Sequence, residues 1–201
     1  MSLKHAILGF LSSNSLSGYD LKKAFDRSVR HFWPANQSQI YRTLAALKDD
    51  GLVEQEVIER EERLDMKVYH ITDAGYKELH QWLSTPLPPQ DDREAFLIQI
   101  YFGGKLSDEE LDALLQREIR RFEERLAIYT SMYAKYQEKI KSHDNPRSFF
   151  MNVLTLEYGI LNAQTSLEWL KSIAARVKLG DYTLRDFEGV VQEQEVVDLE
   201  S

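Results

Sequence analysis

Residues 37–54, QSQIYRTLAALKDDGLVE, decide the fold because they join a short amphipathic helix to the start of a strand. Apolar residues recur every three or four positions, which predicts a helix from about residue 36 to residue 50. They are Ile40, Leu44 and Leu47. Gly51 predicts the end of this helix, because glycine readily adopts the left-handed conformation at which helices terminate. The opposite face carries small and polar side chains, namely Ser38, Arg42, Ala45 and Asp49.

Two shorter helices are expected before this one. The first covers about residues 4–12 and ends in a polar run. The second begins at a capping box, in which Ser17 is followed three positions later by Asp20, and it extends to about Val29. Pro34 ends the connector to the central helix, because the residue before a proline is pushed out of helical geometry.

After the central helix the apolar pattern changes to that of strands. Residues 52–59 and 66–71 predict a hairpin around the charged loop 60–65. A fourth helix is expected at 73–83, capped at Thr72 or Asp73. Its inward side chains are expected to be Tyr76, Leu79, Trp82 and Leu83. Three helices, a hairpin and a fourth helix within residues 1–85 are the arrangement of a winged helix-turn-helix, with the hairpin as the wing.

Three of the five prolines lie in residues 86–91, which predicts a stiff linker between two domains. The second domain, 92–180, is expected to be all-helical, with helices at 92–102, 107–141 and 145–180. The two long helices carry apolar residues at alternating steps of four and three, as in a coiled-coil seam, so each is expected to need a helical partner. Residues 181–201 form an acidic tail, in which a short helix stays open.

The chain has 201 residues, a net charge of −8 and no cysteine. The lack of cysteine excludes a disulfide framework and fits a reducing compartment, so we expect a cytoplasmic protein. The apolar patch near the N-terminus is too short for a transmembrane helix, and we expect no membrane association. The negative charge disfavours a polyanionic partner, but residues 22–48 hold six basic side chains against one acidic. The first half of the chain therefore contains a basic segment despite the negative net charge.

The polar face of the central helix has the composition of a DNA reader. Arginine pairs with guanine, glutamine with adenine, and alanine meets the methyl group of thymine in the major groove. The first helical turn offers free backbone amides to phosphate, and Tyr41 on the flank could reach a backbone oxygen. Basic residues of the hairpin could hold phosphates beside the groove. The expected DNA-binding residues are Asn36, Gln37, Ser38, Gln39, Tyr41, Arg42, Ala45, Arg60, Arg63 and Lys67.

Each of these residues also has a plain structural alternative. Tyr41 could pack on the second helix, and the polar first turn could serve only as a cap. Arg42 could be a solvated surface residue. The wing arginines could pair with nearby acids, which are Glu61, Glu62 and Asp65.

Catalytic chemistry is not indicated. Residues 103–105, GGK, are similar to the end of a phosphate loop, but Gln99 and Leu106 stand where that motif needs glycine and a hydroxyl residue. The five histidines lack zinc-ligand spacing, so we expect no enzyme, no metal and no cofactor. Two other functions stay open: a winged-helix adaptor that binds protein, and a small-molecule sensor. The sensor would use an aromatic pocket built from Trp33, Trp82, Trp169 and the tyrosines of the long helix.

Six segments carry a resemblance to a known family through their order along the chain. They are SLKHAILGFL (2–11), SGYDLKKAF (17–25), FWPANQSQIYRTLAALKDDGLVE (32–54), KVYHITDAGYKELHQWLSTPLPP (67–89), REAFLIQIYFGGKLSDEEL (93–111) and LTLEYGILNAQTSLEWL (154–170). Together they resemble the PadR family of bacterial transcriptional regulators, in its larger subfamily with a helical Vir-type C-terminal domain. The match covers nearly the whole chain up to about residue 178.

The resemblance implies a mainly α protein, with a winged helix-turn-helix that carries a small β-hairpin wing and an all-α C-terminal dimerisation domain. It implies a homodimer that binds a palindromic operator in double-stranded DNA, as a repressor, with residues 37–42 in the major groove. The wing at 60–67 would contact DNA, although it is more acidic than expected. Some members respond to small aromatic effectors, whose identity does not transfer by residue. The expected dimerisation residues are Leu115, Ile119, Phe122, Leu126, Tyr129, Leu156, Ile160, Leu167 and Leu170.

Overall fold

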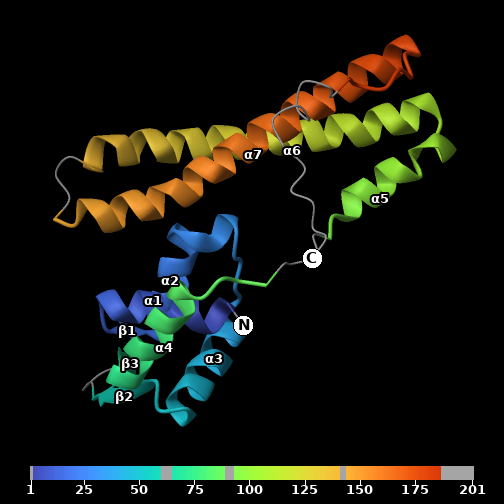
Figure 1. The fold of residues 1–201 in the computed structure, drawn as a ribbon. Helices are drawn as coiled ribbons and strands as arrows, with labels where there is room; N and C mark the ends of the chain where they lie inside the picture. The colour runs from blue at the N-terminus through green and yellow to red at the C-terminus, as the bar shows by residue number, and fades with distance from the viewer. Residues whose placement is uncertain (1, 60–64, 89–92, 141–143, 187–201) are drawn as a thin grey trace, which may run out of the picture. The chain divides into compact units, whose positions relative to one another are not determined.

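The computed structural model describes residues 2–59, 65–88, 93–140 and 144–186. The chain divides into two compact units, Met1–Asp92 and Arg93–Ser201, and each is described separately (Figure 1). The wing tip with Arg60 and Arg63, the last part of the expected linker and the tail 187–201 lie outside the described residues.

The first unit is a winged helix-turn-helix with one more strand than the sequence predicts. Its elements are α1 (Ser2–Ser13), β1 (Leu16–Ser17), α2 (Gly18–Arg27), the 3-10 turn η1 (Val29–His31), α3 (Gln37–Asp49), β2 (Val53–Ile58), β3 (Met66–Ile71) and α4 (Asp73–Ser84). The three strands form an antiparallel sheet in the order β1-β3-β2. The two residues of β1 are too few to give an alternating pattern, which is why the sequence predicts only the hairpin of β2 and β3.

The core of this unit lies between α1, α2, α3 and the base of the sheet. Its largest fully buried side chains include Ile7 and Leu8 of α1, Phe25 of α2, and Ile40 and Leu44 of α3. The predicted apolar face of α3 is therefore confirmed. Gly51 follows α3 with φ 69°, the left-handed conformation expected of a helix terminator.

The inward face of α4 differs from the prediction. Tyr76 and Leu83 are 47% and 68% exposed, so the expectation that they point inward is wrong. The buried stripe instead begins at Gly75 and continues through Leu79, which packs against the core, to Trp82, whose ring stacks on His5 with centroids 4.5 Å apart. The expectation is confirmed for Leu79 and Trp82. Gly75 was not predicted to be buried, because a glycine carries no apolar signal.

The helix α2 also ends earlier than predicted. It stops at Arg27, and η1 follows where the sequence predicts continued helix to Val29. At the break Ser28 has φ −123° and ψ −72°, outside regular helical geometry. Its hydroxyl donates to the carbonyl of Ala24 at 2.6 Å, a bond by which serine can distort the end of a helix.

The second unit consists of α5 (Ala95–Tyr101), the 3-10 turn η2 (Gly103–Lys105), α6 (Asp108–Lys139) and α7 (Pro146–Leu179). Figure 1 shows α6 and α7 side by side as an antiparallel pair. Leu115 and Ile119 of α6 and Leu170 of α7 form its buried cluster. Lys171 also pairs with Glu123 across the two helices at 2.7 Å. The expected packing of the two long helices on each other is confirmed.

The predicted caps of the two long helices are also confirmed, whereas the helix predicted at 92–102 is shorter and spans Ala95–Tyr101. Ser107 and Glu110 form a reciprocal capping box at the start of α6. Asn145 caps α7 with proline in its first turn, and Gly180 ends it with φ 65°. No described helix is long and apolar enough to cross a lipid bilayer.

Candidate nucleic-acid interface

The outward face of α3 is an exposed strip held by a fully buried inner edge. Ile40, Leu44 and Leu47 are at most 1% exposed, so the helix cannot rotate without losing its core contacts. All seven reading residues expected on and before α3 are exposed, which are Asn36, Gln37, Ser38, Gln39, Tyr41, Arg42 and Ala45. We name these seven residues the reading strip.

Two members of the reading strip also cap the helix. The Asn36 side chain accepts a hydrogen bond from the Gln39 backbone N–H at 2.9 Å, and the Gln39 side-chain oxygen accepts from the Asn36 N–H at 2.9 Å. This reciprocal box satisfies two of the backbone N–H groups that a helix start leaves without an intrahelical partner. The amide oxygens of Asn36 and Gln39 are therefore engaged, while their NH₂ groups can still donate.

Tyr41 lies against the start of α2 and keeps part of its ring in solvent. Its side chain is 41% exposed, and its ring occupies the space beside Gly18 where another residue would carry a Cβ. Tyr69 of β3 lies nearby and is buried. Burial raises the pKa of the Tyr69 phenol, and the negative charge that Tyr41 acquires on ionisation raises it further. Packing on the second helix and partial exposure to solvent therefore occur together in Tyr41.

The described part of the wing offers one of the expected basic residues. Lys67 is exposed on β3, where its Cα pairs with that of Val57 on β2. Arg60, Arg63 and the acids Glu61 and Glu62 lie outside the described residues. At the base of the wing, His70 bonds to Ser15 at 2.7 Å and to Glu56 at 3.0 Å, which ties the loop after α1 to the hairpin.

Several basic side chains of the 22–48 segment already have partners in the chain. Lys22 pairs with Asp26 one turn later on α2. The Lys23 amine lies 4.3 Å from the centre of the Tyr19 ring, and the Lys48 amine donates to Gln55 of β2 at 3.5 Å. No hydrogen bond or ion pair is found for Arg42 among the described residues, so its guanidinium remains available for an external acceptor.

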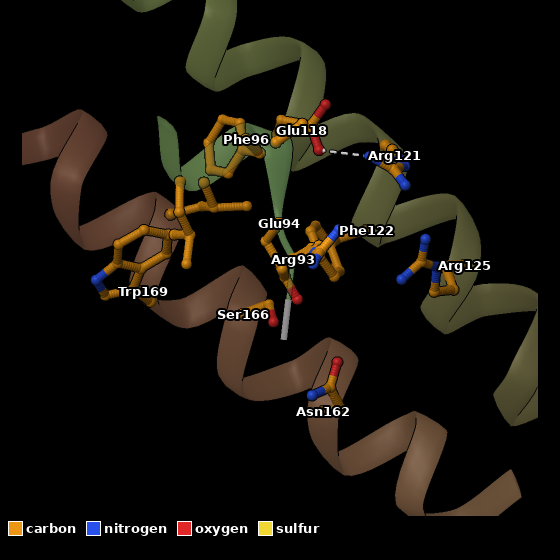
Figure 2. A pocket seen from close by; sticks show the side chains of 13 residues that line it. Arg93, Glu94, Phe96, Glu118, Arg121, Phe122, Arg125, Asn162, Ser166 and Trp169 are labelled. Carbon is orange, nitrogen blue, oxygen red and sulfur yellow. Dashed lines mark hydrogen bonds and ion pairs between the residues drawn. The ribbon is translucent and has the colours of Figure 1, made fainter. Parts of the chain in front are cut away.

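The second unit contains a pocket of about 410 Å³ between α5, α6 and α7. Aromatic rings line it, with Phe96 and Trp169 edge to face at 6.4 Å. Three arginines also line it, namely Arg93, Arg121 and Arg125 (Figure 2). The Glu118 carboxylate accepts from Arg121 at 3.0 Å, and Arg125 lies 4.9 Å from the Phe122 ring centre.

The pocket contains one of the three tryptophans that the sequence suggests for an aromatic site. Trp169 lines the pocket, whereas Trp33 and Trp82 belong to the first unit and are not among its lining residues. The tyrosines of α6 are not among the lining residues. Tyr133, for example, donates to Glu157 of α7 at 3.2 Å, and this bond raises the pKa of the Tyr133 phenol. Among the described residues, no group of three or more His, Asp or Glu side chains could hold a metal ion.

The residues expected at a dimer contact lie within the helical hairpin of one chain. Leu115, Ile119, Leu156 and Leu170 are buried, and the other five are partly buried. Five of them, Leu115, Ile119, Phe122, Leu167 and Leu170, pack together in the buried cluster of this unit. Larger apolar side chains remain exposed on its outside, namely Ile128, Phe150, Met151, Tyr158 and Leu161.

Sequence reasoning missed two features of these sites. The first is the contact in which the Tyr41 ring packs against Gly18. No local sequence pattern predicts this contact, because the two residues meet only in the fold. The second is the pocket arginines. Arg121 and Arg125 are one turn apart on α6, a spacing that places both on one face, but many solvated helices share it.

Two family models match the chain in succession. The model described as the transcriptional regulator PadR-like family covers residues 7–81, and that described as virulence activator alpha C-term covers residues 93–178. The negative transcriptional regulator PadR of Bacillus subtilis is 33% identical over 180 residues, which cover 87% of this chain and 97% of that protein.

Solved structures agree with this match. The crystal structure of Bacillus subtilis PadR in complex with operator DNA has a TM-score of 0.77 at 32% identity, over 88% of this chain and 99% of that chain. PadR in complex with p-coumaric acid has a TM-score of 0.69 at 32% identity, over 88% and 95%. The Vibrio cholerae virulence activator AphA has a TM-score of 0.72 at 28% identity, over 89% and 99%.

Proposed function

The chain belongs to the PadR-like family of transcriptional regulators, and from this premise we propose that it represses transcription by binding operator DNA as a homodimer. As a member of a regulator family it is not an enzyme. The adaptor and the DNA-independent sensor are set aside, because a relative at 32% identity has been solved on operator DNA.

The observation that carries the proposal is the reading strip on a helix with a buried opposite edge. The strip presents Arg42 without a competing partner among the described residues, next to the small residues Ser38 and Ala45 that let the backbone approach base edges. In this proposal Arg42 reads a base, whereas Tyr41 and Lys67 contact phosphates and fix the register.

A homodimer suits this function because a two-fold protein places two reading helices in major grooves about one helical turn apart. The exposed apolar residues on the outside of the α6–α7 pair support such an assembly. On α7, Phe150, Tyr158 and Leu161 lie eight and three residues apart, a spacing that places them on one side of the helix. Five of the nine expected dimerisation residues support it indirectly, because they pack in the core of the hairpin that carries these residues.

We propose that the protein represses transcription rather than activating it, because PadR of Bacillus subtilis is a negative regulator. AphA, with lower identity, is described as an activator. A promoter fusion with and without the protein tests the sign. Expression from the regulator's own promoter should rise when the protein is absent, and a fall would contradict repression.

DNA binding is tested by a gel shift on the DNA upstream of the gene, with two matched variants. Arg42→Ala should lower affinity by roughly 5- to 150-fold, the equivalent of about 1–3 kcal/mol for a base contact, and should relax sequence choice. Lys67→Ala should weaken all sequences alike and reduce the salt slope by about one. If Arg42→Ala binds like the wild type, the reading strip does not have the proposed role.

A second activity is favoured by the pocket of the second unit. We propose that it binds a small aromatic acid that regulates DNA binding, because a lining of aromatic rings and arginines suits a planar anion. The complex of Bacillus subtilis PadR with p-coumaric acid supports this class of effector.

The test uses p-coumarate as the probe and tryptophan fluorescence as the readout. Quenching should occur in the wild type and in Trp82→Phe, and should be lost in Trp169→Phe. Quenching that survives in Trp169→Phe, or that is lost in Trp82→Phe, would place the ligand elsewhere.

A further inference from the structure

Gly18 is the first residue of α2, directly after the N-cap residue Ser17. A Cβ at this position would lie 2.5 Å from Cε1, 2.7 Å from Cζ and 3.1 Å from the hydroxyl oxygen of Tyr41. The Tyr41 ring thus fills the volume that any other residue at position 18 would need. The contact joins the first helix of the helix-turn-helix to the second.

Backbone geometry does not explain a glycine here. Only Gly51 and Gly180 have positive φ among the described residues, so Gly18 adopts a conformation open to other residues. Glycine in a helix is less stable than alanine by roughly 0.5–1 kcal/mol, because it loses more conformational freedom on folding. The close approach of Tyr41 is therefore the feature that requires glycine.

The backbone at Gly18 is held firmly from its N-terminal side. The Ser17 hydroxyl accepts a hydrogen bond from the Asp20 N–H at 3.1 Å and donates to the Asp20 carboxylate at 2.6 Å. Ser17 also pairs with Val68 in the sheet. The Tyr41 ring, in contrast, is the end of a partly exposed side chain and can turn into solvent.

We propose that Gly18 is a positioning residue for DNA recognition: the missing side chain at Gly18 seats the Tyr41 ring so that its hydroxyl meets the DNA backbone. This inference rests on the proposed function of the reading strip. Tyr69 is a buried residue near Tyr41. Its burial and the nearness of Tyr41 both raise the pKa of the Tyr69 phenol.

Gly18→Ala should displace the Tyr41 ring and leave the rest of the unit folded. The cheapest way to relieve the overlap is to swing the ring outward, because moving α2 would break the Ser17 cap and the β1–β3 pairing. Loss of a hydrogen bond to a phosphate should lower operator affinity by about tenfold. Tyrosine is neutral and releases no counterions, so the slope of log affinity against log salt should stay unchanged.

The experiment is a double-mutant cycle on operator binding with Gly18→Ala, Tyr41→Ala and the double variant. Each single variant should lose affinity, and the double variant should bind no worse than Tyr41→Ala, because alanine at position 18 then finds no ring to displace. Gly9→Ala is the matched control, since a Cβ at Gly9 would meet nothing within 4 Å, and it should bind like the wild type.

A second readout needs no DNA. In protein labelled with ¹³C-tyrosine, the ring signals of Tyr41, identified by their loss in Tyr41→Ala, should shift in Gly18→Ala and stay in place in Gly9→Ala. Melting temperatures of all variants report whether the unit is folded.

The outcomes separate this inference from the proposed function. If wild-type protein binds the operator and Arg42→Ala weakens it, but Gly18→Ala binds normally, the positioning role is wrong and the reading strip stands. Additive losses in the cycle would also overturn it, because Gly18 would then act apart from Tyr41. If the wild type binds no operator, the proposed function fails. If the Tyr41 signals are also unchanged in Gly18→Ala, then Gly18 does not position the Tyr41 ring.

Discussion

Replacing Gly75 with alanine should destabilise the first unit, because α4 approaches the chain after α3 too closely for a Cβ. A Cβ at Gly75 would lie 2.2 Å from the carbonyl oxygen of Leu52 and 2.7 Å from Cγ1 of Ile71. Reaching ordinary contact requires a displacement of about 1 Å, and the nearer neighbour is backbone rather than a flexible side chain.

That backbone is part of a hydrogen-bonded junction. The Leu52 carbonyl accepts from the Thr72 N–H at 3.1 Å, and the Thr72 hydroxyl donates to the Gly51 carbonyl at 2.8 Å. The same hydroxyl accepts from the Gly75 N–H at 3.1 Å as the N-cap of α4. Overpacking here and the loss of one such bond together amount to about 3 kcal/mol.

Thermal melting followed by circular dichroism measures this effect. A loss of about 3 kcal/mol should lower the melting temperature of the first unit, which spans Met1–Asp92, by roughly 12–24 °C. Gly9→Ala is the control: it lies inside α1 with open space around its Cβ position, and should melt at or slightly above the wild-type temperature. A Gly75→Ala protein that melts within about 2 °C of the wild type would refute the reasoning.

Three further predictions concern the cap, the charges and the hairpin. Asn36→Ala should destabilise the first unit by about 1 kcal/mol in urea titrations, because it removes the α3 cap; no change would mean that the capping box is dispensable. Hydrogen bonds, first from Lys4 and then from His5, lower the pKa of the Glu78 carboxyl, so its contribution to stability is present above the ordinary glutamate pKa and is lost as pH falls through the lowered value. Glu78→Gln should therefore flatten the acid limb of the stability profile, and an unchanged limb would contradict this. Leu115→Ala should destabilise the second unit by about 2–5 kcal/mol, whereas Tyr158→Ala should leave the fold intact and weaken self-association in analytical ultracentrifugation; a destabilised Tyr158→Ala monomer would argue against a free apolar face.

The sequence was sufficient for elements whose ends carry strong local signals. Asn36 and Gly51 mark both ends of α3, and Ser107 and Gly180 mark the outer ends of the helical hairpin. The apolar period of α3 also identified its exposed strip, because a helix buried through Ile40 and Leu44 must present the other side to solvent.

Features that depend on contacts distant along the chain could not be predicted in this way. The strand β1 exists only through its pairing with β3, and the face of α4 follows from the approach of Gly75 to Leu52. A glycine that is buried for steric reasons looks the same in sequence as one in a loop. For the same reason the seat of Tyr41 on Gly18 became visible only in the fold.

Site-directed DNA cleavage tests the central claim most directly. The chain has no cysteine, so Asp49→Cys supplies one attachment point for an iron–EDTA label at the far end of the exposed α3 face, outside the reading strip. On a palindromic operator the label should cut at two clusters about one helical turn apart, while the same label on Ser131→Cys, exposed on α6, should give a different and weaker pattern. Cleavage that is absent or spread evenly from the Asp49→Cys label, on DNA that the protein still binds, would contradict the assignment of α3 as the DNA-reading helix.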